Sequence, residues 1–452
     1  MTLRRLLSLA VLAPALAGAQ ATRLRVPFTL DTLPNGLTLI VHEDHSVPVV
    51  TTNMWFHVGS GDEKVGRTGF AHLFEHLMFM GSENAPYPQF DRLLEAAGAD
   101  NNGSTTEDRT NYYEQGPSSS LKLMLWLEAD RMGWLLPTMD KPKVDLQRDV
   151  VKNERRQSYE NQPYGMVADV LPKLMYPAAH PYSWPVIGSM VDLSAASVDD
   201  VKDFFRKYYA PNNATLVVAG DVKADEVRAI VRQYFSDIPR GPAIERPAPA
   251  TFTVRDTAVT LEDRVQLARL YLNWHTVKST DADAPALQVA SYVLAGARTS
   301  RLTQALVYNG EVATTVQAYN DGKRLDGDFT IVATARPGKA LDTLQTVIDE
   351  NLQRLASDGP TARELAQARN AIEASFLRGI QTVSGKADQL NEYYYQTGNP
   401  DGFQDDLDKL RGVTAADIQR VVRQYLQAPR VMVSVVPQGK QALAATQKKV
   451  TQ

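Results

Sequence analysis

The chain has 452 residues, enough for about two to four domain-sized units, and its 44% hydrophobic and 22% charged residues are ordinary for a globular protein. Its formal net charge of −4, from 48 basic and 52 acidic residues, gives no electrostatic reason to expect nucleic acid or an anionic membrane as a partner. The sequence contains no cysteine, which excludes disulfides and thiolate metal ligands, so a metal site would have to use histidine and carboxylate groups.

The N-terminus has the pattern of a secretory signal peptide, which we assign to residues 1–21. Arg4 and Arg5 form its charged region, residues 6–16 form a short apolar stretch, and Ala17-Gly18-Ala19 is a cleavage pattern. The alternative is a buried N-terminal helix. The signal predicts a periplasmic or secreted protein, and since no later apolar run approaches ~18 residues, we expect no membrane span.

The first half of the mature chain alternates strand and helix patterns. A turn at Pro34-Asn35-Gly36 between two hydrophobic stretches predicts a hairpin. The expected strands are residues 28–33, 37–42, 49–58, 104–115 and 214–219. The expected helices are residues 70–80, 88–97, 118–135, 141–159, 197–209 and 224–235.

The helix expected over residues 70–80 carries the most informative motif, H-x-x-E-H, from His72 to His76. Two histidines four residues apart project from the same side of a helix, so both imidazoles reach one metal ion while Glu75 points into the same space. This pattern is typical of metal-assisted peptide hydrolysis. The helix is otherwise apolar and should be largely buried, so a divalent metal would satisfy its polar edge. The alternative is a His/Glu salt bridge on a solvated face.

A catalytic zinc ion needs a third protein ligand and one open position. The candidate is Glu154, in the helix expected over residues 141–159. Val144, Val151 and Ser158 give that helix a row that should face inward, and Glu154 lies beside this row.

With these motifs the chain resembles the pitrilysin-type inverzincin family of zinc peptidases, in a bacterial secreted short form. That family includes mitochondrial processing peptidase and insulin-degrading enzyme. Its glutamate ligand follows the second histidine at about the distance seen here, where Glu154 lies 78 positions after His76 in a V-x-N-E-R setting. The resemblance implies that His72, His76 and Glu154 bind one Zn²⁺ per chain and that Glu75 is the general base that activates a zinc-bound water. Many family members carry an acidic residue at the position of Gln147, so this chain departs from the pattern there.

The second half of the chain echoes the first. Residues 198–208 align without gaps to residues 415–425, and a strand follows in both places. The resemblance likewise implies an α+β fold with two homologous halves, each a mainly antiparallel sheet packed with helices, which face each other across a chamber. We therefore divide the chain into four parts after the signal peptide: an N-terminal catalytic, zinc-binding half (22–236), a Pro/Gly-rich linker (237–250), a C-terminal non-catalytic half (251–440) and a tail (441–452).

The resemblance also suggests where substrate binds. The segment Asn102-Gly103-Ser104-Thr105 is similar to the family pattern N-A-x-T, whose edge strand pairs with the substrate backbone, and strand addition suits loose sequence preference. The alternative is a Gly/Asn turn that enters a hairpin. We also expect His42 and His45, near a strand end, to lie in a solvated loop.

An arginine and a tyrosine that contact substrate in the family are missing here. Their expected positions are Val307 and Ala313, although Arg301 and Tyr308 lie nearby. We therefore expect a homodimer, or a heterodimer in which a family subunit supplies the Arg/Tyr pair.

The sequence thus predicts a secreted zinc metalloendopeptidase that hydrolyses peptides or unfolded segments. One alternative is a structural or binding subunit of a heteromeric peptidase complex, and another is a zinc amidase or esterase. The four residues His72, Glu75, His76 and Glu154 argue against a purely structural subunit.

Overall fold

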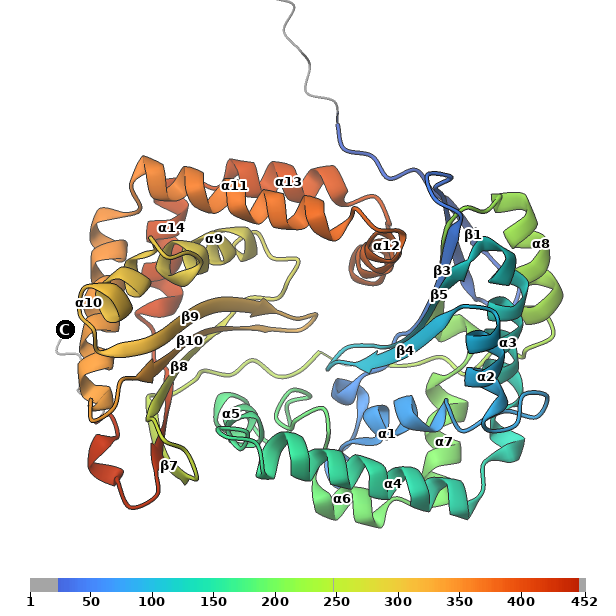
Figure 1. Ribbon diagram of the computed structural model, residues 1–452, viewed down its shortest axis with the longest axis horizontal. Coiled ribbons are helices and arrows are strands. Elements are labelled where there is room, and N and C mark those ends of the chain that lie inside the picture. The colour runs from blue at the N-terminus through green and yellow to red at the C-terminus, as the bar shows by residue number, and fades with distance from the viewer. Residues whose placement is uncertain (1–22, 247, 447–452) are drawn as a thin grey trace, which may run out of the picture.

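The computed structural model describes residues 23–246 and 248–446, so the predicted signal peptide and the end of the predicted tail lie outside the described residues. The described chain forms two halves side by side, each a sheet packed with helices (Figure 1). The strands of the first half are β1 (Thr29–Thr32), β2 (Thr38–Glu43), β3 (Val49–Phe56), β4 (Asp100–Thr105), β5 (Thr110–Pro117) and β6 (Ala214–Gly220). Those of the second are β7 (Thr257–Asp263), β8 (Arg269–Thr276), β9 (Ala313–Gly322), β10 (Gly327–Ala335) and β11 (Val431–Pro437).

The helices surround these sheets. In the first half they are α1 (Phe70–Leu77), α2 (Gln89–Ala96), α3 (Leu121–Trp134), α4 (Lys141–Arg155), α5 (Val167–Met175), α6 (Met190–Ala195), α7 (Val198–Tyr208) and α8 (Ala224–Phe235). In the second half they are α9 (Ala284–Ala295), α10 (Leu341–Asp358), α11 (Ala362–Gly379), α12 (Val383–Thr397), α13 (Phe403–Gly412) and α14 (Ala415–Val421).

The two sheets share one topology. The strand orders are β1-β2-β6-β3-β5-β4 and β7-β11-β8-β10-β9, so β2, β6, β3, β5 and β4 correspond to β7, β11, β8, β10 and β9. Within each sheet only β2 with β6, and β7 with β11, pair in parallel. The prediction of an α+β fold with two homologous halves and mainly antiparallel sheets is thereby confirmed.

The two similar sequence segments, residues 198–208 and 415–425, form equivalent elements in the two halves. Both α7 and α14 begin with a capping box, formed by Ser197 with Asp200 and by Thr414 with Asp417. The strands that follow, β6 and β11, are buried along their whole length, and each has a neighbouring strand on both sides in its sheet.

Each half lends one helix to the sheet of the other (Figure 1). Helix α12 packs on β3 and β6, where Leu390 and Ala387 meet Val217 in one buried apolar cluster. Helix α5 packs on β8 and β11, and its Val167 joins Val433 in another cluster. The halves are therefore joined by buried apolar surface as well as by the linker.

The linker itself is held in place. Its described residues contain no helix or strand between α8 and β7. Arg246 donates from Nε to Asp62 Oδ1 over 2.9 Å and also to the main-chain oxygen of His57. The domain boundaries given above stay predictions.

Three local predictions were wrong. Residues 104–115 are not one strand, because the turn from Thr106 to Arg109 separates β4 from β5, and the Thr106 hydroxyl accepts hydrogen bonds from the two amides that close the turn. Ser158 is exposed rather than inward-facing, because α4 ends at Arg155 and continues as a π-helix. His42 is buried in β2, where its Nδ1 lies 2.6 Å from the Pro27 carbonyl oxygen.

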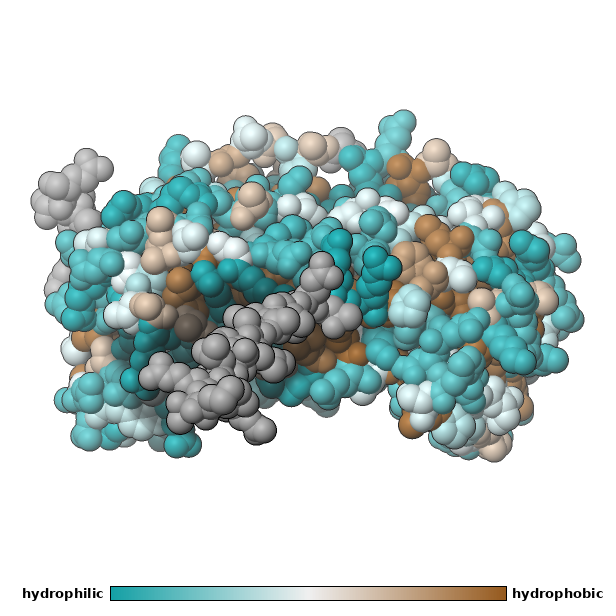
Figure 2. Space-filling model, turned by 90° about the horizontal axis from the view of Figure 1, so that it is seen from above, coloured by the Kyte–Doolittle hydropathy of each residue, from teal (hydrophilic) through white to brown (hydrophobic). Residues whose placement is uncertain are grey.

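Among the described residues, none of the helices is long and apolar enough to cross a membrane. The face that Figure 2 presents is mostly hydrophilic, with hydrophobic residues in small separate groups.

Candidate metal centre

Helix α1 presents the histidines of the motif from a buried position. It begins after Gly69, whose φ of 88° lies in the left-handed region that favours glycine. Phe70, Leu73, Phe74 and Leu77 are buried in the core of the first half, as the sequence predicted. Because the burial of these apolar residues fixes the rotation of the helix about its axis, it also fixes the direction in which the polar edge of the helix faces.

Helix α4 brings a carboxylate to that edge. Asp140 caps its N-terminus by accepting from Lys143 N, and Val144 and Val151 are buried, as expected. Helix α4 packs against α1, and Glu154 lies three residues after Val151.

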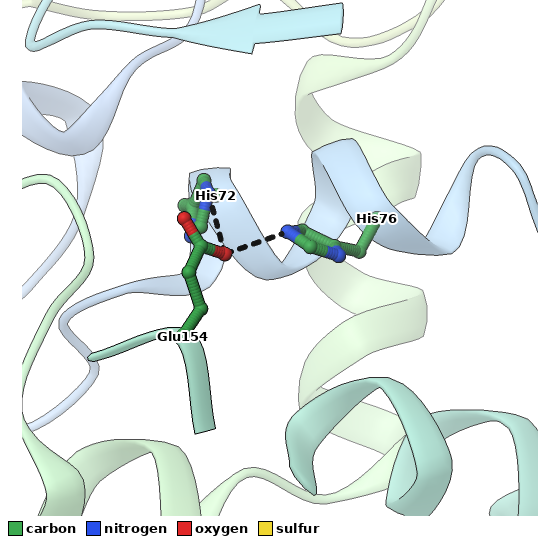
Figure 3. A group of neighbouring side chains, drawn as sticks. All are labelled: His72, His76 and Glu154. Carbon is green, nitrogen blue, oxygen red and sulfur yellow. Dashed lines mark ion pairs between the residues drawn. The ribbon is translucent and has the colours of Figure 1, made fainter. Parts of the chain in front are cut away.

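The three predicted ligands meet in space (Figure 3). One ligand atom from each of His72, His76 and Glu154 lies within 4.8 Å of the others. Glu154 Oε2 is 3.3 Å from His76 Nε2 and 3.7 Å from His72 Nε2, with the two imidazole rings nearly perpendicular at 82°. The three groups thus form His–Glu ion pairs and also place three metal-ligating side chains around one point.

The protonation states of these groups suit a cation. Burial lowers the pKa of His72 to about 4, so its ring is neutral near pH 7. A hydrogen bond with His76 lowers the pKa of Glu154, which is therefore a carboxylate. Imidazole nitrogen and carboxylate oxygen are the ligand types that zinc accepts, and the donor set thus fits a Zn²⁺ ion.

Glu75 lies on the same helix but makes a different contact. Its Oε2 accepts a hydrogen bond of 2.6 Å from Thr105 Oγ1, on β4. Burial raises the pKa of Glu75. A carboxylate with a raised pKa beside a metal centre is suited to exchange a proton with water.

Strand β4, which contains the predicted substrate-binding residues, is the edge of the first sheet, and within the described part of the chain it pairs only with β5. Thr106 N donates to Arg109 O across the turn, so by alternation the main-chain groups of Gly103 and Thr105 point to the free edge. In agreement, Gly103 N donates to the side chain of Asn102 over 2.8 Å rather than to β5. Ser104 Oγ instead donates to Asn111 on β5.

Two residues that the motif search missed support the metal centre. Glu63 is only 9% exposed, and its carboxyl oxygens accept from Gly69 N over 2.9 Å, from Ala71 N over 2.7 Å and from the indole of Trp184. It thereby binds the first turn of α1. The second of these residues is Arg155, which directly follows Glu154 at the end of α4. The sequence did contain one signal for Glu63: it is an acidic residue just before the glycine-rich segment at which the helix begins.

The positions where the sequence departs from the family pattern have other roles. Gln147 donates to Met80 Sδ over 2.7 Å. Val307 belongs to a π-helix (Thr303–Tyr308), and Ala313 is buried at the start of β9. Arg301 is held by Glu364, with an Nε–Oε1 distance of 2.7 Å, and is therefore committed within its own half.

Comparison with known proteins identifies the family. The model "Insulinase (Peptidase family M16)" matches residues 38–183, and the model "Peptidase M16 inactive domain" matches residues 195–372. The chain belongs to peptidase family M16. The predicted resemblance to pitrilysin-type inverzincins is thereby confirmed.

Curated M16 relatives align along most of their length. The chain is 28% identical to the zinc protease PqqE of Helicobacter pylori, over 87% of this chain and 89% of that protein. It is 24% identical to a probable mitochondrial-processing peptidase subunit beta of Arabidopsis thaliana, over 90% of this chain and 77% of that protein.

Solved M16 structures agree with the fold. A protease from Helicobacter pylori superimposes with a TM-score of 0.86 at 26% identity, covering 91% of this chain and 99% of that chain. A peptidase M16 inactive domain from Pseudomonas fluorescens has a TM-score of 0.82 at 20% identity, over 93% of this chain and 99% of that one, and supports the fold alone.

Proposed function

We propose that this M16 protein is a zinc-dependent endopeptidase that hydrolyses peptides or unfolded segments. The observation that carries the proposal is the convergence of His72, His76 and Glu154 from two helices, with Glu75 beside them. The names of the zinc protease relatives agree with zinc as the metal.

His72, His76 and Glu154 would hold the ion. When bound, zinc supplies a Lewis acid that polarises a carbonyl group and acidifies water. Glu75 would take a proton from the attacking water on its carboxylate and later deliver that proton to the leaving amine. The free edge of β4 would pair with an extended peptide, because Gly103 and Thr105 direct main-chain groups outward.

Cleavage of an internally quenched peptide library by the purified chain tests the proposal. Cleavage that is lost with a zinc chelator and restored by added zinc is expected. A chain that binds one zinc per molecule and cleaves no peptide would contradict an autonomous peptidase.

A second candidate is a subunit of a heteromeric peptidase complex, and the observation that favours it is the absence of arginine and tyrosine at positions 307 and 313. We propose that a different family subunit supplies this pair. Specific activity that falls on dilution supports this, whereas undiminished activity counts against it. A panel of small amides and esters beside the peptides separates an amidase or esterase from a peptidase.

We also propose that the protein acts in the periplasm or outside the cell, because residues 1–21 have the pattern of a signal peptide. N-terminal sequencing of the exported protein, expected to begin at Gln20 or Thr22, tests this.

A further inference from the structure

The contact between Thr105 and Glu75 joins two parts of the site that come from different elements. Glu75 is on α1, and Thr105 is the last residue of β4, the edge strand of the sheet. The Thr105 hydroxyl donates to Glu75 Oε2 over 2.6 Å. Among the residues that the structure describes, no other side chain donates to this carboxylate, so Thr105 alone restricts its rotation by hydrogen bonding.

The contact also leaves half of the carboxylate free. One oxygen of Glu75 is engaged by Thr105, while Oε1 makes no hydrogen bond to the described residues. A base whose second oxygen is held can present the first in one orientation, and a positioned base is more effective than a freely rotating one.

The packing beside Glu75 is close as well. At Gly103, a Cβ atom would lie 3.1 Å from Glu75 Cγ and 3.4 Å from Phe79 Cε2. The glycine therefore lets β4 pass near enough to α1 for the Thr105 hydroxyl to reach the carboxylate.

We propose that Thr105 is a positioning residue for Glu75. Strand β4 thereby orients the general base through the side chain of Thr105 and binds the peptide along its free edge. This inference rests on the proposed function, since it assigns a base to be positioned. It predicts that loss of the hydroxyl lowers kcat more than it raises KM, because Glu75 would lose its orientation while the β4 main chain remains in place.

Thr105→Val, which removes the hydroxyl and keeps the shape, is the decisive variant. We expect kcat to fall about 10- to 100-fold, the range for a hydrogen bond to a charged group, with KM within about 3-fold and zinc content unchanged. Thr105→Ser should stay within about 3-fold of the native kcat. Thr315→Val, an exposed threonine on the corresponding edge strand β9, serves as the control and should leave kinetics unchanged.

A double-mutant cycle separates positioning from general damage to the strand. In a Glu75→Gln background, Thr105→Val should cause no further loss, because there is no base left to orient. An additional loss as large as in the native background, or equal kcat for Thr105→Val and the native chain, would overturn the proposal.

Crystal structures of the Thr105→Ser and Thr105→Val variants give a readout that needs no activity. The Glu75 carboxylate should keep its position in the serine variant and rotate away in the valine variant, and an unmoved carboxylate in both would refute the inference. If the native chain cleaves nothing, the proposed function fails, while these structures still decide whether Thr105 holds Glu75.

Discussion

Arg155 donates from Nη1 to the main-chain oxygen of Gly188 over 2.7 Å. Arg155 directly follows the candidate ligand Glu154 on α4, and the backbone at Gly188 lies against that of Gly69, where a Cβ on residue 188 would come within 2.4 Å of Gly69 Cα. One side chain thus connects the helix of the carboxylate with the start of the helix of the histidines.

Replacement of Arg155 by methionine should therefore destabilise the protein and weaken zinc binding together. Arg155 is 6% exposed and also pairs with Asp169 through Nη2 at 2.7 Å, so its loss leaves a buried carboxylate with one fewer partner. We expect a loss of about 2–3 kcal/mol in the free energy of unfolding. Urea titration and competition with a zinc chelator measure the two effects. Arg156→Met is the matched control, because Arg156 is exposed and, among the described residues, its side chain bonds only to Asn153, three positions earlier.

Glu63→Gln should lower zinc affinity without a large change in side-chain volume. The carboxyl oxygens of Glu63 accept three N–H groups, and an amide would place its own N–H against one of them. We expect about 10-fold weaker zinc binding, measured by calorimetry. Unchanged affinity in a well-folded variant would show that the first turn of α1 does not need two acceptor oxygens at position 63. Lys64→Gln, at an exposed neighbouring position, should have no effect.

Substitutions in the motif should separate metal binding from chemistry. Glu75→Gln is expected to retain one zinc per chain and to lose about 100- to 10,000-fold in kcat, because the base is removed while the ligands stay. His72→Ala should lose both the metal and the activity. Zinc content by mass spectrometry, together with peptide cleavage, checks both variants, and near-native cleavage by Glu75→Gln would refute its assignment as base.

The stability of the protein should fall in mild acid because of His57. Burial, with a contribution from the charge of Arg246, lowers the pKa of His57 to about 3 from an ordinary 6.5. Between these values the unfolded chain binds a proton that the folded chain does not, so stability decreases as the pH drops through this window. The loss from this group is up to about 2 kcal/mol at pH 5. Urea titrations at pH 7 and pH 5 measure it, and an identical difference in a His57→Gln variant would contradict the assignment.

Local patterns predicted much of the fold and of the candidate site. The four-residue spacing of His72 and His76 on an apolar helix needed only helical geometry. The convergence of Glu154 with the histidines depends on tertiary packing, and only the family resemblance pointed to it. The ligand and base roles of these residues stay predictions.

Other features were beyond the reach of local patterns. The β4–β5 turn was missed because Thr106 and its neighbours lack the glycine or proline that usually marks a turn. The bonds of Glu63 and Arg155 join segments whose proximity arises only on folding. The exchange of α5 and α12 was equally hidden, since an apolar helix face does not indicate which sheet it covers.

That exchange has a consequence for how the molecule can be divided. Because α12 covers the sheet of the first half and α5 covers that of the second, each half would expose apolar sheet surface if it were produced alone. If the chain were cut within the linker, the two fragments should stay associated, because α12 and α5 each pack on the sheet of the other half. Two separately produced fragments should accordingly be unstable alone and recover their structure only when mixed.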